Sequence, residues 1–370
     1  MKDKNQITAC RRKTSIGGQA LIEGIMMRGP QKTAMAVRNT KGEVVVEEFP
    51  TQTAKRPAIC RWPFIRGIFG YIDSMVLGYK CLMRSAELSG LEDIVEESPK
   101  KKKKRLEKEA KAAAERGETV AEVAEPAPVE EVEETKEEKK DEEKLPAWVM
   151  TATMVVGLVL GLGLALGLFL YLPMLAYNLA SDHIGFLNHD NVAVNSLIKS
   201  AFEGVLRIVL LVGYMAAISL MKDIRRTFMY HGAEHKTIFC YEAGEELTVE
   251  NVRRQRRFHP RCGTSFLIVM LLVSIFISFF IDPIAVLISG EELPTLLRVL
   301  VKILLLPLIV GIGYELIKFA GRHDNWFTRL ISLPGVWLQH ITVFEPTDDM
   351  IECAITSVKL VIPDDDSDRW

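Results

Sequence analysis

Two histidines and a glutamate in the segment His231-Gly-Ala-Glu-His235 have the types and the spacing of a metal-dependent hydrolytic site. The pattern is H-x-x-E-H, the inverted form of the zinc-peptidase helix motif. Histidines four positions apart lie one turn from each other on a helix, so both imidazoles can reach one metal ion. Glu234 has the right side chain to take a proton from a water molecule that such an ion activates. The motif predicts metal binding by His231 and His235, with Glu234 as the general base.

A second pair of ligand-type residues follows in His259-Pro-Arg-Cys262, where an imidazole and a thiol stand three positions apart. This spacing also lets two side chains converge on one ion. Imidazole and thiolate ligands favour zinc over magnesium or calcium. We therefore expect a zinc site formed by His231, His235, His259 and Cys262. The alternative is that these polar residues pair with one another and with the nearby arginines.

Such a site fits two classes of function, and the sequence leaves both open. In a membrane-bound hydrolase, the motif histidines bind zinc with a third ligand, and one position stays open for water. The residues considered for that third ligand are His259, Cys262 and Glu315. If all four His and Cys side chains bind, the shell is closed and structural, and the basic cluster 253–257 can dock a protein, anionic lipid or ribosomal partner.

Transport is a third class of function, with weaker support. Charged residues stand in or beside apolar segments, where charge is costly and often functional: Glu203, Arg207, Arg298, Lys302 and Glu315. These side chains could equally lie at the membrane interfaces and extend their charges into water.

Four apolar segments predict a membrane protein: residues 148–172, 202–221, 266–281 and 296–319. A helix of roughly 20 apolar residues crosses the hydrocarbon core of a bilayer. The expected fold class is mainly α, a polytopic helical membrane protein of about four transmembrane helices with a small α+β cytoplasmic N-terminal region.

Charge asymmetry predicts the orientation of these helices. Residues 222–261 carry nine Lys or Arg, whereas the connections 177–200 and 282–294 carry only Lys199. Basic loops stay in the cytoplasm, so both termini and the His/Cys loop are expected there, with the lipid bilayer as a partner. The opening residues lack the apolar segment of a cleaved secretory signal, and six cysteines without paired spacing fit a reducing compartment.

Composition divides the chain into four expected regions: 1–95, a cytoplasmic region with a β-hairpin and an amphipathic helix; 96–146, a charged disordered linker; 147–322, the membrane domain with its cytoplasmic His/Cys loop 222–262; and 323–370, a cytoplasmic C-terminal strand and helix. The linker is almost wholly Lys, Glu, Ala and Pro, which cannot bury enough apolar surface to offset its ordering entropy. Its acids cancel its bases, so we expect no specific nucleic acid as a partner.

Local patterns predict the elements outside the membrane. Strands at 33–38 and 43–49 flank Asn39-Thr-Lys-Gly42, which is typical of a hairpin. Apolar residues at helical spacing over 62–83 predict a helix that covers this hairpin, or else lies in the membrane interface. Residues 341–345 have the pattern of a strand, and a helix is expected from Thr347-Asp-Asp to about residue 361.

The segment 17–30 is rich in glycine but matches neither phosphate-binding loop pattern. Its glycines are expected to allow tight turns or a close approach of the backbone to another element. Glu23 and Arg28, which lie within it, are either site residues or an ion pair, and we favour the ion pair.

The phrases GGQALIEGIMMRGP, YHGAEHKTIFCYEAGEELTVENV, HPRCGTSFL and LQHITVFEPTDDMIECAI are long enough to be specific. They resemble the bacterial membrane-protein family called domain of unknown function 1385, often labelled a predicted metal-dependent enzyme. The similarity covers nearly everything except the charged linker. It implies a metal site at the same His and Cys residues, and it supplies no substrate.

Overall fold

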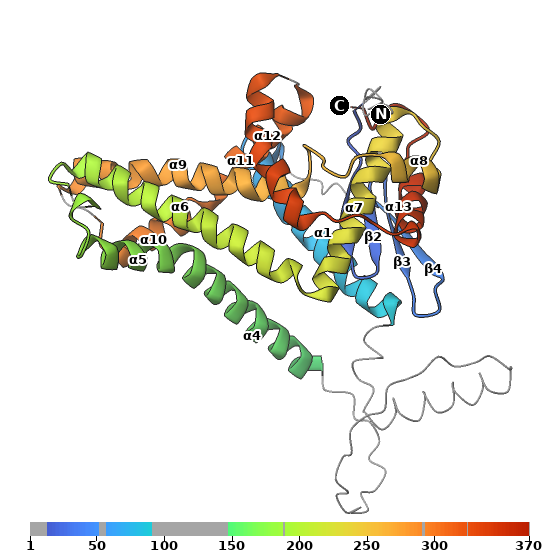
Figure 1. Ribbon diagram of the computed structural model, residues 1–370, viewed down its shortest axis with the longest axis horizontal. Helices are drawn as coiled ribbons and strands as arrows, with labels where there is room; N and C mark the ends of the chain where they lie inside the picture. Colours follow the sequence, from blue (N-terminus) through green and yellow to red (C-terminus); the bar gives the residue numbers. More distant parts are fainter. Residues whose placement is uncertain are drawn as a thin grey trace, which may run out of the picture. The chain divides into compact units, whose positions relative to one another are not determined.

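The computed structural model describes residues 13–51, 57–90, 147–187, 189–290, 293–323 and 325–369 (Figure 1). Contacts divide the chain into two units, residues 1–90 with 166–370 and residues 91–165. The described part of the smaller unit is residues 147–165, which form helix α4 (Ala147–Leu166) except for its last residue. The predicted linker at 96–146 lies outside the described residues.

A four-stranded antiparallel sheet lies near the N-terminus, with its strands in chain order: β1 (Gly17–Leu21), β2 (Gly24–Arg28), β3 (Lys32–Arg38) and β4 (Val44–Pro50). The predicted hairpin is confirmed as β3 and β4, and Gly42 takes the left-handed conformation with φ of 84° at its turn. Strands β1 and β2 were missed because glycine and methionine weaken the β-propensity signal of this segment.

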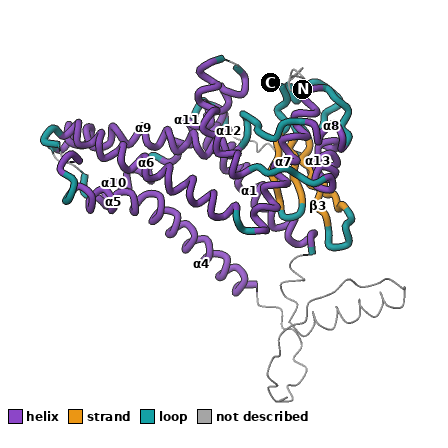
Figure 2. The backbone as a smooth tube through the Cα atoms, in the orientation of Figure 1, coloured by secondary structure: helices purple, strands orange, loops and turns teal. Residues whose placement is uncertain are grey.

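Each face of the sheet is covered, because alternate residues of a strand point to opposite sides. Helices α7 (Lys222–Ala243) and α13 (Asp348–Val361) pack on the face that carries Ile25 and Met27. Helix α1 (Ile65–Ser89) packs on the other face, where Met35 and Cys81 form a second core. The prediction that the amphipathic helix covers the hairpin is therefore confirmed. Figure 2 shows that helices make up most of the other described residues.

Within the part of the chain that the structure describes, three helical stretches are long and apolar enough to cross a membrane: residues Val159–Ser181, Val192–Ser219 and Gly263–Ser289. The first runs from α4 through a π-helical turn (Gly167–Tyr171) into α5 (Leu172–Ser181), and the others are α6 and α9. Between 11 and 28 % of their most apolar stretches is buried, so most of these side chains face outward. Exposed apolar surface of this extent fits lipid better than water.

The predicted fourth span is a bent pair rather than one straight helix. Helices α10 (Thr295–Leu304) and α11 (Leu306–Arg322) meet at 44°, so the spans number up to four if this pair counts as one. Pro307 stands in the first turn of α11, where no backbone N–H has a partner within the helix, so its missing N–H does not weaken α11. The same missing N–H and the proline ring prevent α10 from continuing as one regular helix.

The charged residues of the apolar segments pair inside the protein. Glu203 of α6 accepts hydrogen bonds from Arg207, at 2.7 Å, and from Lys302 of α10, at 2.8 Å. Arg298 of α10 lies 2.5 Å from Asp282 of α9. All five side chains are buried, so these charges stabilise contacts between helices instead of reaching the surface.

The region 222–262, predicted as a loop, is mostly helical. Helix α7 ends at Gly244, which adopts the left-handed conformation that commonly terminates helices. A short helix, α8 (Val249–Arg254), begins at Thr248, whose side chain accepts from the backbone N–H of Asn251.

The predicted strand at 341–345 is wrong. Helix α12 (Trp326–Thr342) includes Ile341 and Thr342, and the residues after it are extended without pairing to any described strand. Phe344 instead donates its N–H to the carbonyl of Phe228 on α7 at 3.0 Å. β-branched residues favour extended backbone, but a strand must also form hydrogen bonds with the free edge of another strand. Here the extended residues lie against helix α7 instead. The predicted C-terminal helix is confirmed as α13.

Candidate metal centre

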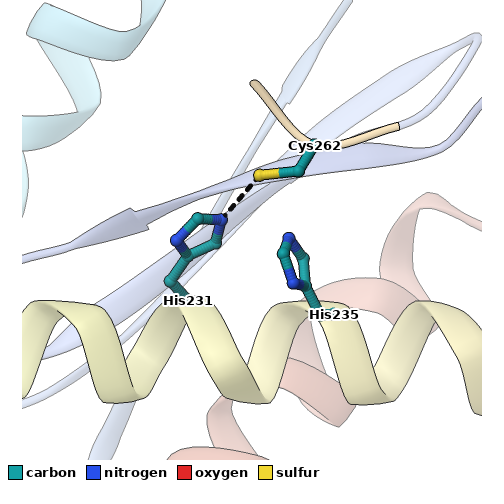
Figure 3. Close-up of side chains that lie close together, drawn as sticks. All are labelled: His231, His235 and Cys262. Atoms are coloured by element: carbon teal, nitrogen blue, oxygen red, sulfur yellow. Dashed lines mark hydrogen bonds between the residues drawn. The ribbon is translucent and has the colours of Figure 1, made fainter. Parts of the chain in front are cut away.

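Three of the predicted ligands converge: His231 and His235 from α7, and Cys262 from the residue before α9 (Figure 3). One donor atom from each lies within 4.8 Å of the other two. The histidines stand one turn apart, as the motif predicts, and both rings point toward the thiol. His235 and Cys262 are buried, and His231 is half-buried. The geometry is that of a group that could hold one metal ion.

Backbone carbonyls fix the orientation of both imidazoles. Nδ1 of His231 lies 3.1 Å from the carbonyl oxygen of Thr342, and Nδ1 of His235 lies 2.5 Å from that of Arg257. A carbonyl oxygen can only accept, so each Nδ1 carries the proton and each Nε2 presents a lone pair. Metal-binding histidines commonly donate their second N–H to a carbonyl in this way.

The two Nε2 atoms differ in their surroundings. His231 Nε2 lies 3.0 Å from the Cys262 Sγ. His235 Nε2 is buried and has no hydrogen-bond partner among the described residues. A buried nitrogen left in this state costs free energy, and such exceptions call for an unseen partner such as a water or an ion. Two imidazole nitrogens and one sulfur are a donor set that suits zinc.

The Cys262 thiol is placed to ionise. Burial raises its pKa, but the neighbouring His235 and the hydroxyl and N–H groups of Thr264 lower it, and the net pKa lies below the usual cysteine value. Cys262 is also the N-cap of α9, where the helix dipole favours negative charge. Because the thiolate is the form that binds metals, this residue fits the role of a ligand.

Glu234 lies beside the cluster and is not one of its three members. Its side chain is buried, and its Oε1 accepts the backbone N–H of Gly18 at 3.1 Å. Burial raises the pKa of this carboxyl group to about 7, with Cys262 adding to the effect and His231 opposing it. Glu234, His235 and Cys262 line one cavity of about 130 Å³. A carboxylate with a pKa near neutral can accept and return a proton.

The structure places His259 next to the cluster but outside it. Its ring centroid lies 5.5 Å from that of His235, and its Nε2 lies 3.8 Å from Oε2 of Glu242. Although burial raises the pKa of Glu242, His259 and Arg261 hold it at about 2, so this carboxylate stays ionised. Gln339 of α12 bonds both the N–H and the carbonyl of His259 at 2.8 Å.

Glu315, considered as an alternative third ligand, is engaged elsewhere. It accepts two hydrogen bonds from the guanidinium of Arg66 on α1, at 2.7 and 2.5 Å. This bidentate pair connects α1 to α11. Glu315 is therefore not part of the cluster, whose third member is Cys262.

The family described as "Protein of unknown function (DUF1385)" matches residues 62–364. The chain belongs to this family. It is also similar to "Uncharacterized protein YqhQ" of Bacillus subtilis (strain 168), with 31 % identity over 343 residues, which are 92 % of this chain and 90 % of that protein. No solved structure matches the chain.

The expected close approach of the glycine-rich segment to another element is confirmed at Gly18, whereas sequence reasoning missed Glu242 and Gln339, which also shape the site of this DUF1385 protein. A Cβ on Gly18 would lie 2.7 Å from the carbonyl oxygen of Met26 and 3.0 Å from Cγ of Glu234, so glycine is required for the close approach. The glycine-rich composition of 17–30 was the available signal for it. Glu242 and Gln339 carried no local signal, since their partners lie in other segments.

The expected ion pair between Glu23 and Arg28 is wrong in this DUF1385 protein. Glu23 pairs with Arg226 of α7 and accepts a hydrogen bond from Tyr230 at 3.2 Å. Its backbone has a φ of 51° at the turn between β1 and β2, and this turn brings the carboxylate to α7.

Proposed function

We propose that this DUF1385 protein is a zinc-dependent hydrolase whose site lies at the cytoplasmic face of a bacterial inner membrane. The observation that carries the proposal is the arrangement of His231, His235 and Cys262, in which His235 Nε2 is buried and points toward the other two donors. Three protein ligands are the usual number at a catalytic zinc, whereas four close a structural site.

In this proposal, Glu234 is the residue of the chain that transfers the proton during hydrolysis. A bound zinc ion would lower the pKa of water and polarise the substrate's acyl group. Glu234 accepts a proton from the attacking water as the water oxygen adds to the acyl carbon. It then passes this proton to the leaving group as the bond between the acyl carbon and that group breaks. The N–H of Gly18 holds the carboxylate toward the shared cavity.

A structural zinc site is the second proposal, and the position of His259 favours it. Its ring is close to that of His235, so a small shift would bring a fourth ligand to the cluster. The basic cytoplasmic surface would then dock a protein, lipid or ribosomal partner. Against this, His259 lies beside Glu242, with 3.8 Å between Nε2 and Oε2, and its backbone is fixed by two hydrogen bonds to Gln339.

Cobalt substitution tests the choice between an open and a closed site. Cobalt(II) replaces zinc in such sites and reports its ligands through visible absorption. We expect a sulfur-to-cobalt band that Cys262→Ser removes, and a spectrum that changes when azide or acetohydroxamate is added. Glu234→Gln should keep about one metal per chain, because a general base is not a ligand, and should abolish hydrolysis of ester or peptide substrates.

The matched comparison is His259→Gln. Under the hydrolase proposal this variant retains the metal and the response to azide. If His259→Gln instead loses the metal as completely as His231→Ala does, and the wild-type spectrum ignores azide, the site is closed and the hydrolase proposal is wrong.

The proposed orientation rests on the nine basic residues of 222–261. In intact cells, a cysteine introduced by Glu246→Cys should resist a membrane-impermeant maleimide, whereas one introduced by Asp190→Cys should react. Both residues are exposed, and the parental protein corrects for the native cysteines. The reverse labelling pattern would place the candidate metal centre outside the cytoplasm.

A further inference from the structure

We propose that helix α12 lies in the interface of the lipid bilayer, with one face inserted among the headgroups and upper acyl chains of the leaflet beside the candidate metal centre. The partner of this face is lipid. The inference concerns a surface of the protein and not the hydrolysis proposed above, so it does not depend on that reaction.

The exposed face of α12 is apolar and aromatic. Its members Trp326, Leu330, Leu333 and Trp337 are between 56 and 76 % exposed. They stand at positions i, i+4, i+7 and i+11, which lie along one narrow stripe because a helix has 3.6 residues per turn. Large apolar side chains that form a continuous exposed surface mark a contact with lipid or with a partner.

The buried face of α12 has the opposite character. Apart from Leu338, it consists of small or polar residues: Thr328, Ser332, Gly335, Gln339 and Thr342. Gly335 packs so closely on Ser265, in the first turn of α9, that a Cβ at this position would collide with it. A helix in water buries its apolar face, whereas helices in lipid pack through small and polar residues and turn apolar ones outward. The pattern of α12 is that of a helix in contact with lipid.

The position and length of α12 favour the interface over the hydrocarbon core. The helix follows directly after α11, which belongs to the bent pair that could form a span, and Figure 1 shows it projecting to one side of α9. Its 17 residues make a helix about 25 Å long, shorter than the roughly 30 Å of the core. Arg329 and His340 border the stripe, where their polar ends can reach headgroups or water. Tryptophan, present here twice, is enriched at the level of the headgroups.

The buried face of the same helix supports the candidate metal centre. The carbonyl of Thr342 orients His231, and Gln339 bonds the backbone of His259. A helix that rests on the bilayer would therefore hold the candidate metal centre at the surface of the leaflet.

The test measures the depth of α12 by fluorescence quenching in vesicles. Full-length protein is reconstituted in phosphatidylcholine whose acyl chains carry bromine near the headgroup or near the chain end. An environment-sensitive fluorophore is attached to Trp326→Cys or to Trp337→Cys, and the parental protein, labelled in parallel, corrects for the native cysteines. Both labels should lose more fluorescence to the shallow bromine than to the deep one, and to the same extent, because an interfacial helix keeps both ends at one depth. In a spanning helix the two positions would differ in depth by about 16 Å.

Lys359→Cys is the matched control, because this residue is exposed on α13, outside the proposed contact with lipid. Its label should be quenched by iodide in the water and not by brominated lipid. Two different depths for the α12 labels, or α12 labels that brominated lipid does not quench, would overturn the inference. In the second case, quenching by iodide would show that the stripe faces water, and protection from iodide would show that a protein or a second copy covers it. Zinc content, measured in the same preparations, tests the proposed function separately.

Discussion

His235→Ala is expected to reduce the zinc content of the purified protein from about one ion per chain to a small fraction of that value. The Nε2 of His235 is buried and has no hydrogen-bond partner among the described residues, and the substitution removes one of the three donors of the cluster. Binding energy of a metal is also folding energy, and the variant should therefore unfold at a lower temperature and lose the response to added zinc. Metal content is measured by mass spectrometry after purification without chelator.

His340→Ala is the control for that experiment. His340 is an exposed histidine on α12 that stacks on Phe258 and is not part of the cluster, so zinc should stay bound. Wild-type protein that contains no zinc, and takes up none, would contradict the expectation. The histidines would then be ordinary hydrogen-bonding residues.

Gly232→Ala is expected to destabilise the protein by about 3 kcal/mol or more, at the upper end of the usual cost of overpacking. A Cβ at Gly232 would lie 2.0 Å from the carbonyl oxygen of Phe344, which is backbone and cannot rotate away. The segment after α12 crosses α7 at this glycine and is tied there by the bond from Phe344 N–H to Phe228. Moving it would also displace the Thr342 carbonyl that orients His231.

Chemical denaturation of the purified variant measures this effect, and its zinc affinity should fall together with its stability. Gly213→Ala is the matched control, because Gly213 is also helical but has open space around it. Alanine in place of glycine inside a helix is normally neutral or stabilising. A Gly232→Ala variant as stable as the Gly213→Ala variant would show that the crossing is loose.

The sequence by itself determined the features that depend on local spacing. The H-x-x-E-H pattern placed His231 and His235 one turn apart, because a helix has 3.6 residues per turn wherever it lies. Runs of apolar residues predicted helices long enough to span a membrane, since length and hydropathy suffice for that inference. The hairpin of β3 and β4 followed from its turn residues.

Only the tertiary structure decided which distant side chains join the motif. Cys262 and His259 were equivalent as ligands in the sequence, but packing turned Cys262 toward the histidines and placed His259 against Glu242. The carbonyls of Thr342 and Arg257 select the histidine tautomers. Every residue has a backbone carbonyl, so the residue types at these positions do not predict such contacts. The strand predicted at 341–345 failed for a similar reason. β-branched residues join a sheet only where the edge of another strand is free to pair with them. Whether such an edge lies nearby depends on contacts between segments that are far apart in the chain.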